Sequence, residues 1–566
     1  MKFCPILFLS LLSSTVGAVT MQHVCTSQYV AANLPANGTI LGISIDLSSV
    51  TAGRIDAIDG NSRLSACDVN FAYTHDGFDR TNVNYWLPSP ANFLNRYVST
   101  GGEGWNITEN NSSLPTGIEY GAVAGTTDGG FGGFDVSSYE VWLNGNGSIN
   151  WDTVYMFGYQ AIDELSQIGK FLTKSFYNVS DSTKVWSYYD GCSEGGREGW
   201  SQVQIGSDLD GAVIGAPGMH FSFQQIQHLW SQFVEYQLDY YPPYCELEKI
   251  VNLTTEGCDA LDGRVDGVAS RTDLCMLHFN LNSTIGKPYS CSETAEIPNF
   301  MPYIPAQNGT VTAQGVAVAR EILSGAHDNL GRRIYMSYQP TAQFQDAVTS
   351  YDTATGRYGS YFVQQSAQWV EIGLNLLNDD IGLDSFEGVT RDTFRDWIAT
   401  GYQRYQDSLE TTWPDLTTWH KAGGKVLHYH GKSDPQVPTS SSVRYFESVR
   451  KTMYPNISYN QSISELNDWY RLFLIPGGAH CGANSLQPNA PWPETTFATL
   501  IDWVEKGIQP KTLNGTVSST GAQEQICGWP LRPFWTNNGT DFNCVYDQRS
   551  LDTWKYELNA FKMPIY

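Results

Sequence analysis

A pentapeptide with a central serine is the feature of the sequence that most directly indicates chemistry. Gly191-Cys192-Ser193-Glu194-Gly195 has the pattern G-x-S-x-G and stands between a strand-like segment, KVWSYYD, and a helical one. This placement predicts a sharp strand-to-helix turn in which flanking glycines let the serine hydroxyl project away from the backbone. Such a serine attacks carbonyl carbons, so the pattern indicates acyl transfer by Ser193. The alternative is a structural serine in an ordinary glycine-rich turn.

A serine nucleophile needs a histidine that takes its proton and a carboxylate that orients this histidine. Two downstream residues are suitably placed. Asp434 follows the apolar segment KVLHYH and His480 follows RLFLIP, so we expect each at the carboxyl end of a buried strand. The order Ser, Asp, His matches that of other nucleophiles on strand-turn-helix motifs. His428 and His430 lie inside a strand pattern, and we therefore set them aside as bases. Asp434 as a turn former and His480 as a structural histidine are the alternatives.

Two cysteines directly neighbour the predicted nucleophile and base. Cys192 precedes Ser193, and Cys481 follows His480. If the serine and histidine side chains meet at hydrogen-bond distance, these cysteines lie close enough to bridge, and the bridge would hold the two loops together. The alternative is that each cysteine pairs elsewhere or is a small buried hydrophobic residue.

The attack also requires two amide donors to stabilise the developing oxyanion. One is the amide of the residue after the nucleophile, Glu194, and the other comes from an early loop at a strand end. The glycine-rich stretch 101–104 is the natural source, and we assign the second donor to Gly102. The alternative is that this stretch is a plain turn.

An acidic loop predicts a bound cation. Between Cys258 and Cys275 the sequence DALDGRVDGV places three carboxylates and two glycines close together, which suits the six to eight oxygen ligands of Ca²⁺. The spacing is not that of an EF-hand, and an acidic surface loop closed by a disulfide is the alternative. The predicted oxygen ligands are the carboxylates of Asp259, Asp262 and Asp266 and the carbonyls of Arg264 and Val268. A calcium ion here is expected to be structural.

The elements that must position these residues alternate between strand and helix. Buried strands are predicted at NRYVST, YGAVAGTT, KVWSYYD, GAVIGAP, KVLHYH and RLFLIP, and helices at 162–172, 194–204 and 494–506. This alternation predicts an α/β fold with a mostly parallel sheet. Residues 220–418 carry few strand patterns, and we interpret them as a lid segment inserted between the two parts of a catalytic domain, 19–219 and 419–566.

Composition and the amino terminus indicate an exported protein. The 566 residues carry a net charge of −25, which disfavours binding to nucleic acid or anionic lipid surfaces. Residues 1–18 have the layout of a cleavable secretory signal, and no later segment predicts a membrane span. Ten cysteines remain after that signal, so five disulfides are possible, and thirteen N-glycosylation sequons are present. Beyond the pairs discussed above, we expect the cysteines to pair with their neighbours in order.

At these motifs the sequence resembles the fungal tannase and feruloyl esterase family. The family's Ser and His, each beside a bridged Cys with an Asp between them in sequence, correspond to Cys192-Ser193, Asp434 and His480-Cys481. The acidic loop resembles the calcium loop of the family at the ligands given above. The stretches LPANGTILGIS, YYPPYCELEKIV, GRVDGVASRTDLC, PAQNGTVTA and YELNAFKMPIY resemble the tannase branch. The resemblance implies an α/β-hydrolase fold with a lid over its catalytic domain.

By this resemblance, the expected activity is hydrolysis of galloyl esters and depsides in hydrolysable tannins, with polyphenol esters as substrates and no organic cofactor. A feruloyl or chlorogenate esterase is the alternative with the same mechanism. A third interpretation is an inactive hydrolase that serves as a surface binding module, and the presence of Ser193, Asp434 and His480 argues against it. The oligomeric state is not predicted, and a homo-oligomer stays open.

Overall fold

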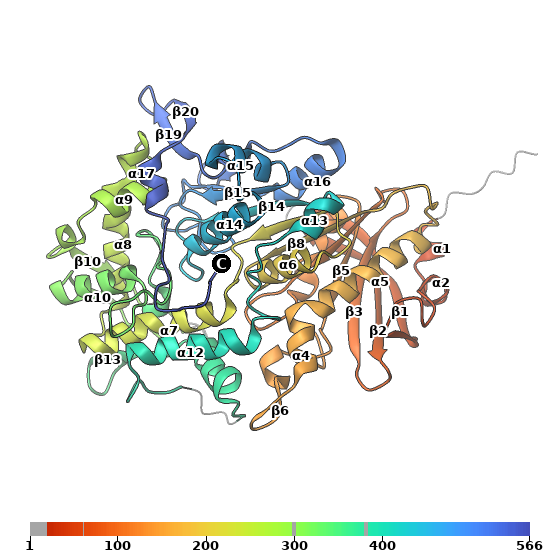
Figure 1. Cartoon of the computed structure of the whole chain (residues 1–566), viewed down its shortest axis with the longest axis horizontal. Coiled ribbons are helices and arrows are strands. Elements are labelled where there is room, and N and C mark those ends of the chain that lie inside the picture. The colour runs from red at the N-terminus through yellow and green to blue at the C-terminus, as the bar shows by residue number, and fades with distance from the viewer. Residues whose placement is uncertain (1–19, 60–61, 297–301, 379–382) are drawn as a thin grey trace, which may run out of the picture.

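A nine-stranded sheet forms the centre of the molecule (Figure 1). The computed structural model describes residues 20–59, 62–296, 302–378 and 383–566, so the expected signal at 1–18 lies outside the described part. The strand order is β1-β2-β3-β5-β4-β8-β9-β14-β15. The strands are β1 (Ile43–Asp59), β2 (Ser62–His75), β3 (Thr81–Pro88), β4 (Arg96–Thr100), β5 (Ala122–Thr127), β8 (Trp186–Cys192), β9 (Gly211–Gly215), β14 (Lys425–Gly431) and β15 (Tyr470–Ile475).

The six strands from β5 to β15 are parallel, which confirms the predicted α/β fold. Their side chains alternate between two apolar layers, as β15 illustrates: Leu472 and Leu474 pack on one face, Phe473 and Ile475 on the other. Both faces are covered by helices, as parallel sheets require. Helices α5 (Ala161–Phe176), α6 (Glu194–Ile205) and α14 (Thr439–Met453) cover one face, and α3 (Leu114–Glu119) and α16 (Thr496–Lys506) cover the other.

The antiparallel edge of the sheet was not predicted. Strands β1, β2 and β3 pair with one another in antiparallel fashion, and β3 pairs with β5. β1 is an edge strand that mixes polar and apolar residues, ISIDLSSVTAGRIDAID, and it lacks the continuous apolar run by which buried strands are recognised. The sequence pattern therefore predicted the six parallel strands and missed the three antiparallel ones, although β3 is largely buried.

The predicted lid segment, residues 220–418, contributes no strand to the nine-stranded sheet in its described part. Its longest helix is α7 (Phe221–Leu238), which packs against α10 (Ala313–Ser324) and α12 (Arg391–Tyr405). It also contains helices α8 (Tyr244–Cys258), α9 (Thr272–His278) and α11 (Gln364–Gln368) and the hairpins β10-β11 (Pro288–Cys291, Gln307–Thr310) and β12-β13 (Thr349–Asp352, Arg357–Ser360). In Figure 1 this yellow-to-teal segment lies to one side of the sheet.

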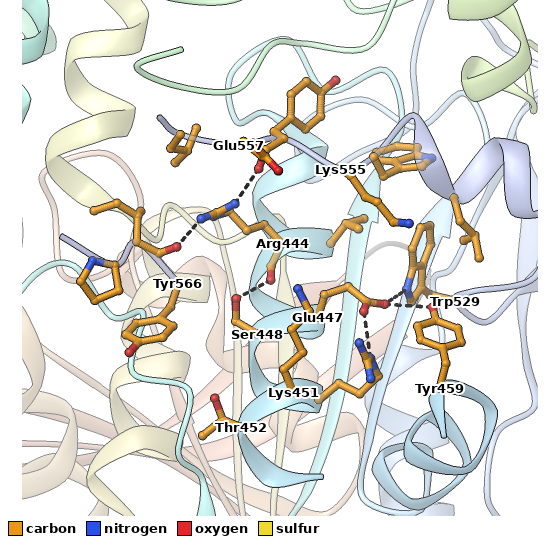
Figure 2. Close-up of a pocket in the computed structure, with 18 of the residues that line it drawn as sticks. Arg444, Glu447, Ser448, Lys451, Thr452, Tyr459, Trp529, Lys555, Glu557 and Tyr566 are labelled. Atoms are coloured by element: carbon orange, nitrogen blue, oxygen red, sulfur yellow. Dashed lines mark hydrogen bonds and ion pairs between the residues drawn. The ribbon is translucent and has the colours of Figure 1, made fainter. Parts of the chain in front are cut away.

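The carboxyl-terminal part returns to the lid segment after forming small peripheral sheets. These contain β16 (Pro491–Trp492), β17 (Thr512–Val517) and β18 (Gln523–Cys527), and the hairpin β19-β20 (Arg532–Thr536, Asp541–Val545). The last residues cross α14, where Arg444 donates to the carbonyls of Tyr556 and Ile565 (Figure 2). A cavity of about 960 Å³ lies between α14 and this segment, and no predicted active-site residue lines it. Within the described residues, no helix is long and apolar enough to span a bilayer.

Candidate active site

Ser193 occupies the sharp turn between β8 and α6 that the sequence predicted. Its φ of 63° lies in the left-handed region, a conformation that costs on the order of 1–3 kcal/mol for a non-glycine residue. The turn is held by hydrogen bonds from the Ser193 amide to Gly215 O at 3.0 Å and from the Gly218 amide to Ser193 O at 2.9 Å. A β-carbon at Gly196 would lie 2.4 Å from Gly215 O, so the close approach of α6 to β9 requires glycine there.

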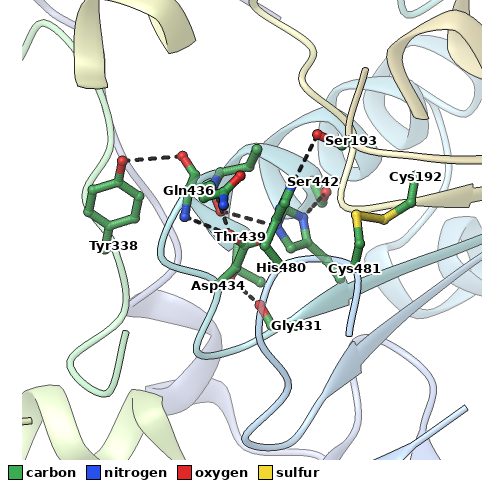
Figure 3. A network of polar contacts seen from close by, with 12 residues as sticks. Cys192, Ser193, Tyr338, Gly431, Asp434, Gln436, Thr439, Ser442, His480 and Cys481 are labelled. Atoms are coloured by element: carbon green, nitrogen blue, oxygen red, sulfur yellow. Dashed lines mark hydrogen bonds and ion pairs between the residues drawn. A yellow bond between two sulfur atoms is a disulfide. The ribbon is translucent and has the colours of Figure 1, made fainter. Parts of the chain in front are cut away.

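The three predicted triad side chains form one hydrogen-bonded row (Figure 3). His480 Nε2 lies 2.8 Å from Ser193 Oγ, and His480 Nδ1 lies 2.8 Å from Asp434 Oδ2. The Asp434 side chain is fully buried and that of His480 is 11% exposed. Asp434 and His480 follow β14 and β15, so parallel strands bring residues distant in sequence to the same sheet edge as Ser193. The contacts are as predicted, and the catalytic roles stay predictions.

The Asp434 carboxylate is saturated with hydrogen-bond donors. Oδ1 accepts the amides of Gln436 at 2.8 Å and Val437 at 2.9 Å, and Oδ2 contacts His480 Nδ1 and His430 Nε2, the latter at 3.0 Å. Burial alone raises the pKa of Asp434, but the charge of His480 and the hydrogen bonds from both histidines outweigh burial and hold that pKa well below its usual value. Asp434 is therefore ionised and able to orient His480.

A disulfide joins the two loops that carry Ser193 and His480. Cys192 is bonded to Cys481 with their Cα atoms 6.0 Å apart, which confirms the predicted pairing (Figure 3). The other pairs follow the expected order: Cys25–Cys67, Cys245–Cys291, Cys258–Cys275 and Cys527–Cys544. Five disulfides therefore account for all ten cysteines that follow the expected signal.

The two predicted oxyanion donors differ in their surroundings. Glu194 begins α6, so its amide lies at the positive end of a helix dipole. The amide of Gly102 donates to Glu198 Oε2 at 3.2 Å, so a substrate oxyanion would have to share or replace this bond. Gly102 O in turn accepts the Gly195 amide at 2.8 Å, which holds the glycine-rich loop against the nucleophile turn. The assignment of both donors stays a prediction.

The family model described as "Tannase and feruloyl esterase" matches residues 67–550. The chain belongs to the tannase and feruloyl esterase family. It is 47% identical over 583 residues to a tannase of Aspergillus oryzae, covering 98% of each chain. A probable feruloyl esterase of Arthroderma benhamiae is 28% identical, covering 86% of this chain and 87% of the relative.

Solved structures in the same family agree. A tannin acyl hydrolase from Aspergillus niger superposes with a TM-score of 0.93 at 50% identity, covering 97% of this chain and 99% of the other. Feruloyl esterase B from A. oryzae superposes with a TM-score of 0.70 at 24% identity, covering 92% of this chain and 100% of that one, which shows a shared fold. The fold is thus of the α/β-hydrolase type, as the sequence resemblance implied.

The lid segment contacts the loop that follows β14 and carries Asp434. Tyr338 Oη lies 2.7 Å from Asp346 Oδ2 and 3.2 Å from Gln436 O, two residues after Asp434 (Figure 3). His228 Nδ1 lies 2.9 Å from both oxygens of Asp346. A polar cluster of the lid segment therefore rests directly on the loop that carries the triad acid.

Glu198 is a candidate that sequence reasoning missed. It lies one helical turn beyond Glu194, accepts the Gly102 amide and contacts Tyr189 Oη at 3.1 Å. Its Oε1 is buried without a hydrogen-bond partner. Burial, assisted by the charge of Glu194, raises the pKa of Glu198 well above its usual value and so favours the neutral acid. The four-residue spacing from Glu194 was the only signal in the sequence, and helical periodicity alone does not distinguish it from a core position.

The acidic loop has the chemistry of a cation site but not a complete set of side-chain ligands. Asp259 accepts the amides of Asp266 and Gly267, and Asp262 accepts that of Arg264 at 3.0 Å. Asp262 Oδ2 is buried and has no hydrogen-bond partner within 3.5 Å, although the Ser270 side chain partly offsets the effect of burial, which raises the pKa of Asp262. Burial raises the pKa of Asp266 to about 7, and the other two carboxylates add to this against the opposing charge of Arg264. Across the described residues, no three His, Cys, Asp or Glu side chains are grouped to hold a metal, so the backbone carbonyls would have to contribute.

Proposed function

We propose that this chain is a secreted serine esterase that hydrolyses galloyl ester and depside bonds of hydrolysable tannins and releases gallic acid. The observation that carries the proposal is the row Ser193–His480–Asp434 in a chain similar over nearly its whole length to a tannase and a tannin acyl hydrolase. The substrates are accordingly small polyphenol esters such as gallotannins and alkyl gallates.

The hydrogen-bond roles in the row follow from the chemistry of its members. Because ionised Asp434 only accepts hydrogen bonds, His480 Nδ1 carries the proton that faces it. The neutral ring then presents the lone pair of Nε2 to the Ser193 hydroxyl, which donates to it. This is the protonation state in which a histidine acts as a general base.

Acylation and deacylation then proceed at one point. Ser193 Oγ bonds to the galloyl carbonyl carbon as its proton passes to His480 Nε2, and the imidazolium is stabilised by Asp434. Collapse of the tetrahedral intermediate breaks the ester C–O bond, and His480 returns the proton to the departing alcohol. Water, deprotonated by His480, attacks the acyl-enzyme; gallic acid leaves, and Ser193 recovers its proton. The amides of Glu194 and Gly102 are the proposed donors to the oxyanion.

The alternative is a feruloyl or chlorogenate esterase, which is favoured by the feruloyl esterase relatives. The two functions differ in the acid that is recognised. Gallate carries three ring hydroxyls, and a pocket whose polar groups pair with them would reject a hydroxycinnamate, which lacks these three hydroxyls. The test is the ratio of kcat/KM for methyl gallate to that for methyl ferulate. We expect the ratio to exceed about 100, since unpaired polar groups discriminate strongly. Faster turnover of methyl ferulate would overturn the proposal in favour of the alternative.

We also propose that the acidic loop binds one structural Ca²⁺. The proposed ligands are Asp259, Asp262 and Asp266 with the carbonyls of Arg264 and Val268. Because these three carboxylates are not grouped around one point in the described structure, binding would have to draw them together. The burial of the Asp262 carboxylate and the mutual repulsion of the three carboxylates support this, because a divalent cation would compensate the cost of both. The loop lies in the lid segment, so the ion would stabilise the fold and take no part in the reaction.

Export and glycosylation complete the proposal. Removal of residues 1–18 would leave a mature chain beginning near Val19, and five disulfides suit an oxidising compartment. Some of the thirteen sequons would then carry N-linked glycans.

A further inference from the structure

The hydrogen-bonded row does not end at Asp434 but continues into the core through residues that the mechanism above does not use. His430 Nε2 lies 3.0 Å from Asp434 Oδ2, and His430 Nδ1 lies 2.7 Å from Ser442 Oγ. Ser442 Oγ lies 2.8 Å from His428 Nε2, and His428 Nδ1 lies 2.9 Å from Tyr470 Oη. The four residues beyond Asp434 are all completely buried.

Strand geometry explains how these residues meet. His428 and His430 are two apart on β14, so their side chains project from the same face of the sheet. Ser442 lies in the first turn of α14, which covers that face, and Asp434 lies on the loop between β14 and α14 (Figure 3). Tyr470 begins the neighbouring parallel strand β15. The row is thus built from β14, the next strand β15 and α14, the first of the two helices between them.

The partners of His430 fix the position of its proton. Nε2 faces Asp434 Oδ2 and, at 3.1 Å, the carbonyl oxygen of Val437, and both of these only accept hydrogen bonds. Nε2 must therefore be the protonated nitrogen of His430. When the His430 ring is neutral, Nδ1 is an acceptor, so the hydroxyl of Ser442 donates to it.

The direction of the remaining bonds then follows. The single hydrogen of Ser442 is used on His430, so His428 Nε2 donates to Ser442 Oγ, and His428 Nδ1 accepts from Tyr470. Burial, with a smaller contribution from the neighbouring His430, holds the pKa of His428 well below its usual value, in agreement with a neutral ring. In this arrangement each bond from Tyr470 to Asp434 has one donor and one acceptor, and all run toward the carboxylate.

We propose that His430 is a positioning residue of the active site: it donates the second hydrogen bond to Asp434 Oδ2 and thereby fixes the oxygen that receives His480. This inference rests on the proposed function. With Oδ1 held by two backbone amides, Oδ2 is the oxygen whose position depends on side chains. Removal of His430 would leave a buried carboxylate oxygen with one donor and a carboxylate freer to turn away from His480.

The test compares two substitutions that fill the same space. Glutamine in His430→Gln can donate to Asp434 through its amide and accept from Ser442, whereas phenylalanine in His430→Phe does neither. With methyl gallate as substrate, we expect His430→Phe to lower kcat at least about tenfold with KM changed less than about twofold, because the loss concerns the triad and not substrate binding. We expect His430→Gln to recover kcat to within about threefold of the wild type.

Each outcome has a defined meaning. A folded His430→Phe with wild-type kcat would overturn the inference, and so would a folded His430→Gln no better than His430→Phe. If His430→Phe does not fold, Ser442→Ala and Ser442→Thr replace it, with kcat expected to fall severalfold in the first and to return in the second; equal kcat in both would overturn the inference. A wild type that hydrolyses neither methyl gallate nor methyl ferulate would instead overturn the proposed function.

The proton positions provide a check that needs no activity. With ¹⁵N-labelled histidine, the resonances of His430, assigned by their loss in His430→Gln, are expected to show a proton on Nε2 and none on Nδ1. A proton on Nδ1 alone would contradict the row of hydrogen bonds and overturn the inference even in an active enzyme.

Discussion

Cys192 is bonded to Cys481, and this bond joins the chain neighbours of Ser193 and His480. Two loops separated by 289 positions are thereby tied at the point where the nucleophile meets its base. In chain-entropy terms, closing a loop of this length adds on the order of 5–6 kcal/mol of stability. The local effect of the disulfide is the one that concerns catalysis, because it limits the distance between hydroxyl and imidazole.

Removal of this disulfide should therefore reduce turnover as well as stability. We expect the double substitution Cys192→Ser with Cys481→Ser to lower kcat about tenfold or more and to lower Tm. The matched control, Cys25→Ser with Cys67→Ser, removes a disulfide at the edge of the sheet and should lower Tm while leaving kcat unchanged. Thermal melts and methyl gallate kinetics measure both. Unchanged kcat in a folded Cys192/Cys481 variant would contradict the positioning role of the bond.

Removal of calcium should destabilise the protein through the acidic loop. If free Ca²⁺ is present at about 100 times its Kd, binding adds about 2–3 kcal/mol to the free energy of unfolding. We therefore expect a chelator to remove this contribution, seen as a lower Tm, and added Ca²⁺ to restore it. Asp262→Asn should abolish this response, whereas Asp407→Asn, at an exposed residue outside the loop, should preserve it. A Tm insensitive to chelator, in a protein whose metal analysis finds no calcium, would contradict the proposed site.

A partly exposed ion-pair cluster at the end of β2 should make stability depend on pH in the alkaline range. His75 Nε2 lies 2.8 Å from Glu164 Oε1, and chiefly this hydrogen bond, with that of Asp79, raises the pKa of His75 to about 9. A raised histidine pKa adds stability that is complete below about pH 6.5 and lost as pH rises to about 9. Because the side chain is partly exposed, we expect about 1 kcal/mol.

The measurement is the Tm of the wild type and of His75→Gln between pH 6 and 10. The wild type should lose its advantage over the variant across this interval. If the difference in Tm between the wild type and His75→Gln does not change with pH, the pKa of His75 is not raised on folding and the prediction is wrong.

Space around the glycine-rich loop makes a further prediction. A β-carbon at Gly102 would lie 2.1 Å from Asn106 O, a backbone atom, whereas one at Gly53 would meet nothing within 4 Å. Gly102→Ala must therefore displace the loop that packs on the nucleophile turn and carries a proposed oxyanion donor. We expect kcat/KM to fall about 100-fold, as for the loss of one oxyanion donor, and Gly53→Ala to be close to the wild type. Wild-type kcat/KM in Gly102→Ala would contradict a role for this loop in the active site.

The sequence was most informative where chemistry follows a strand end. Ser193, Asp434 and His480 each come directly after an apolar run, and parallel strands bring such positions to one edge, so their contacts could be predicted. The Cys192–Cys481 pair could be predicted because these two cysteines are the chain neighbours of Ser193 and His480, which meet in the site. The exposed strand β1 has no continuous apolar run and was missed.

Residues that contact the triad or the glycine-rich loop from the core of the protein could not be predicted in this way. His430 lies within a strand pattern, and nothing in the sequence relates it to Ser442, whose contact depends on how α14 packs on the sheet. Glu198 is likewise connected to Gly102 only through the fold. The same strand pattern that correctly excluded His430 as the base concealed its contact with Asp434.

The central claim is that Ser193 forms the acyl-enzyme, and its most direct test is gallic acid release from methyl gallate by Ser193→Ala. The control is Ser182→Ala, an exposed serine before β8. We predict that kcat/KM falls about 10⁴-fold or more in Ser193→Ala, since the nucleophile is lost, and is unchanged in the control. A folded Ser193→Ala that releases gallic acid at the wild-type rate would contradict the account.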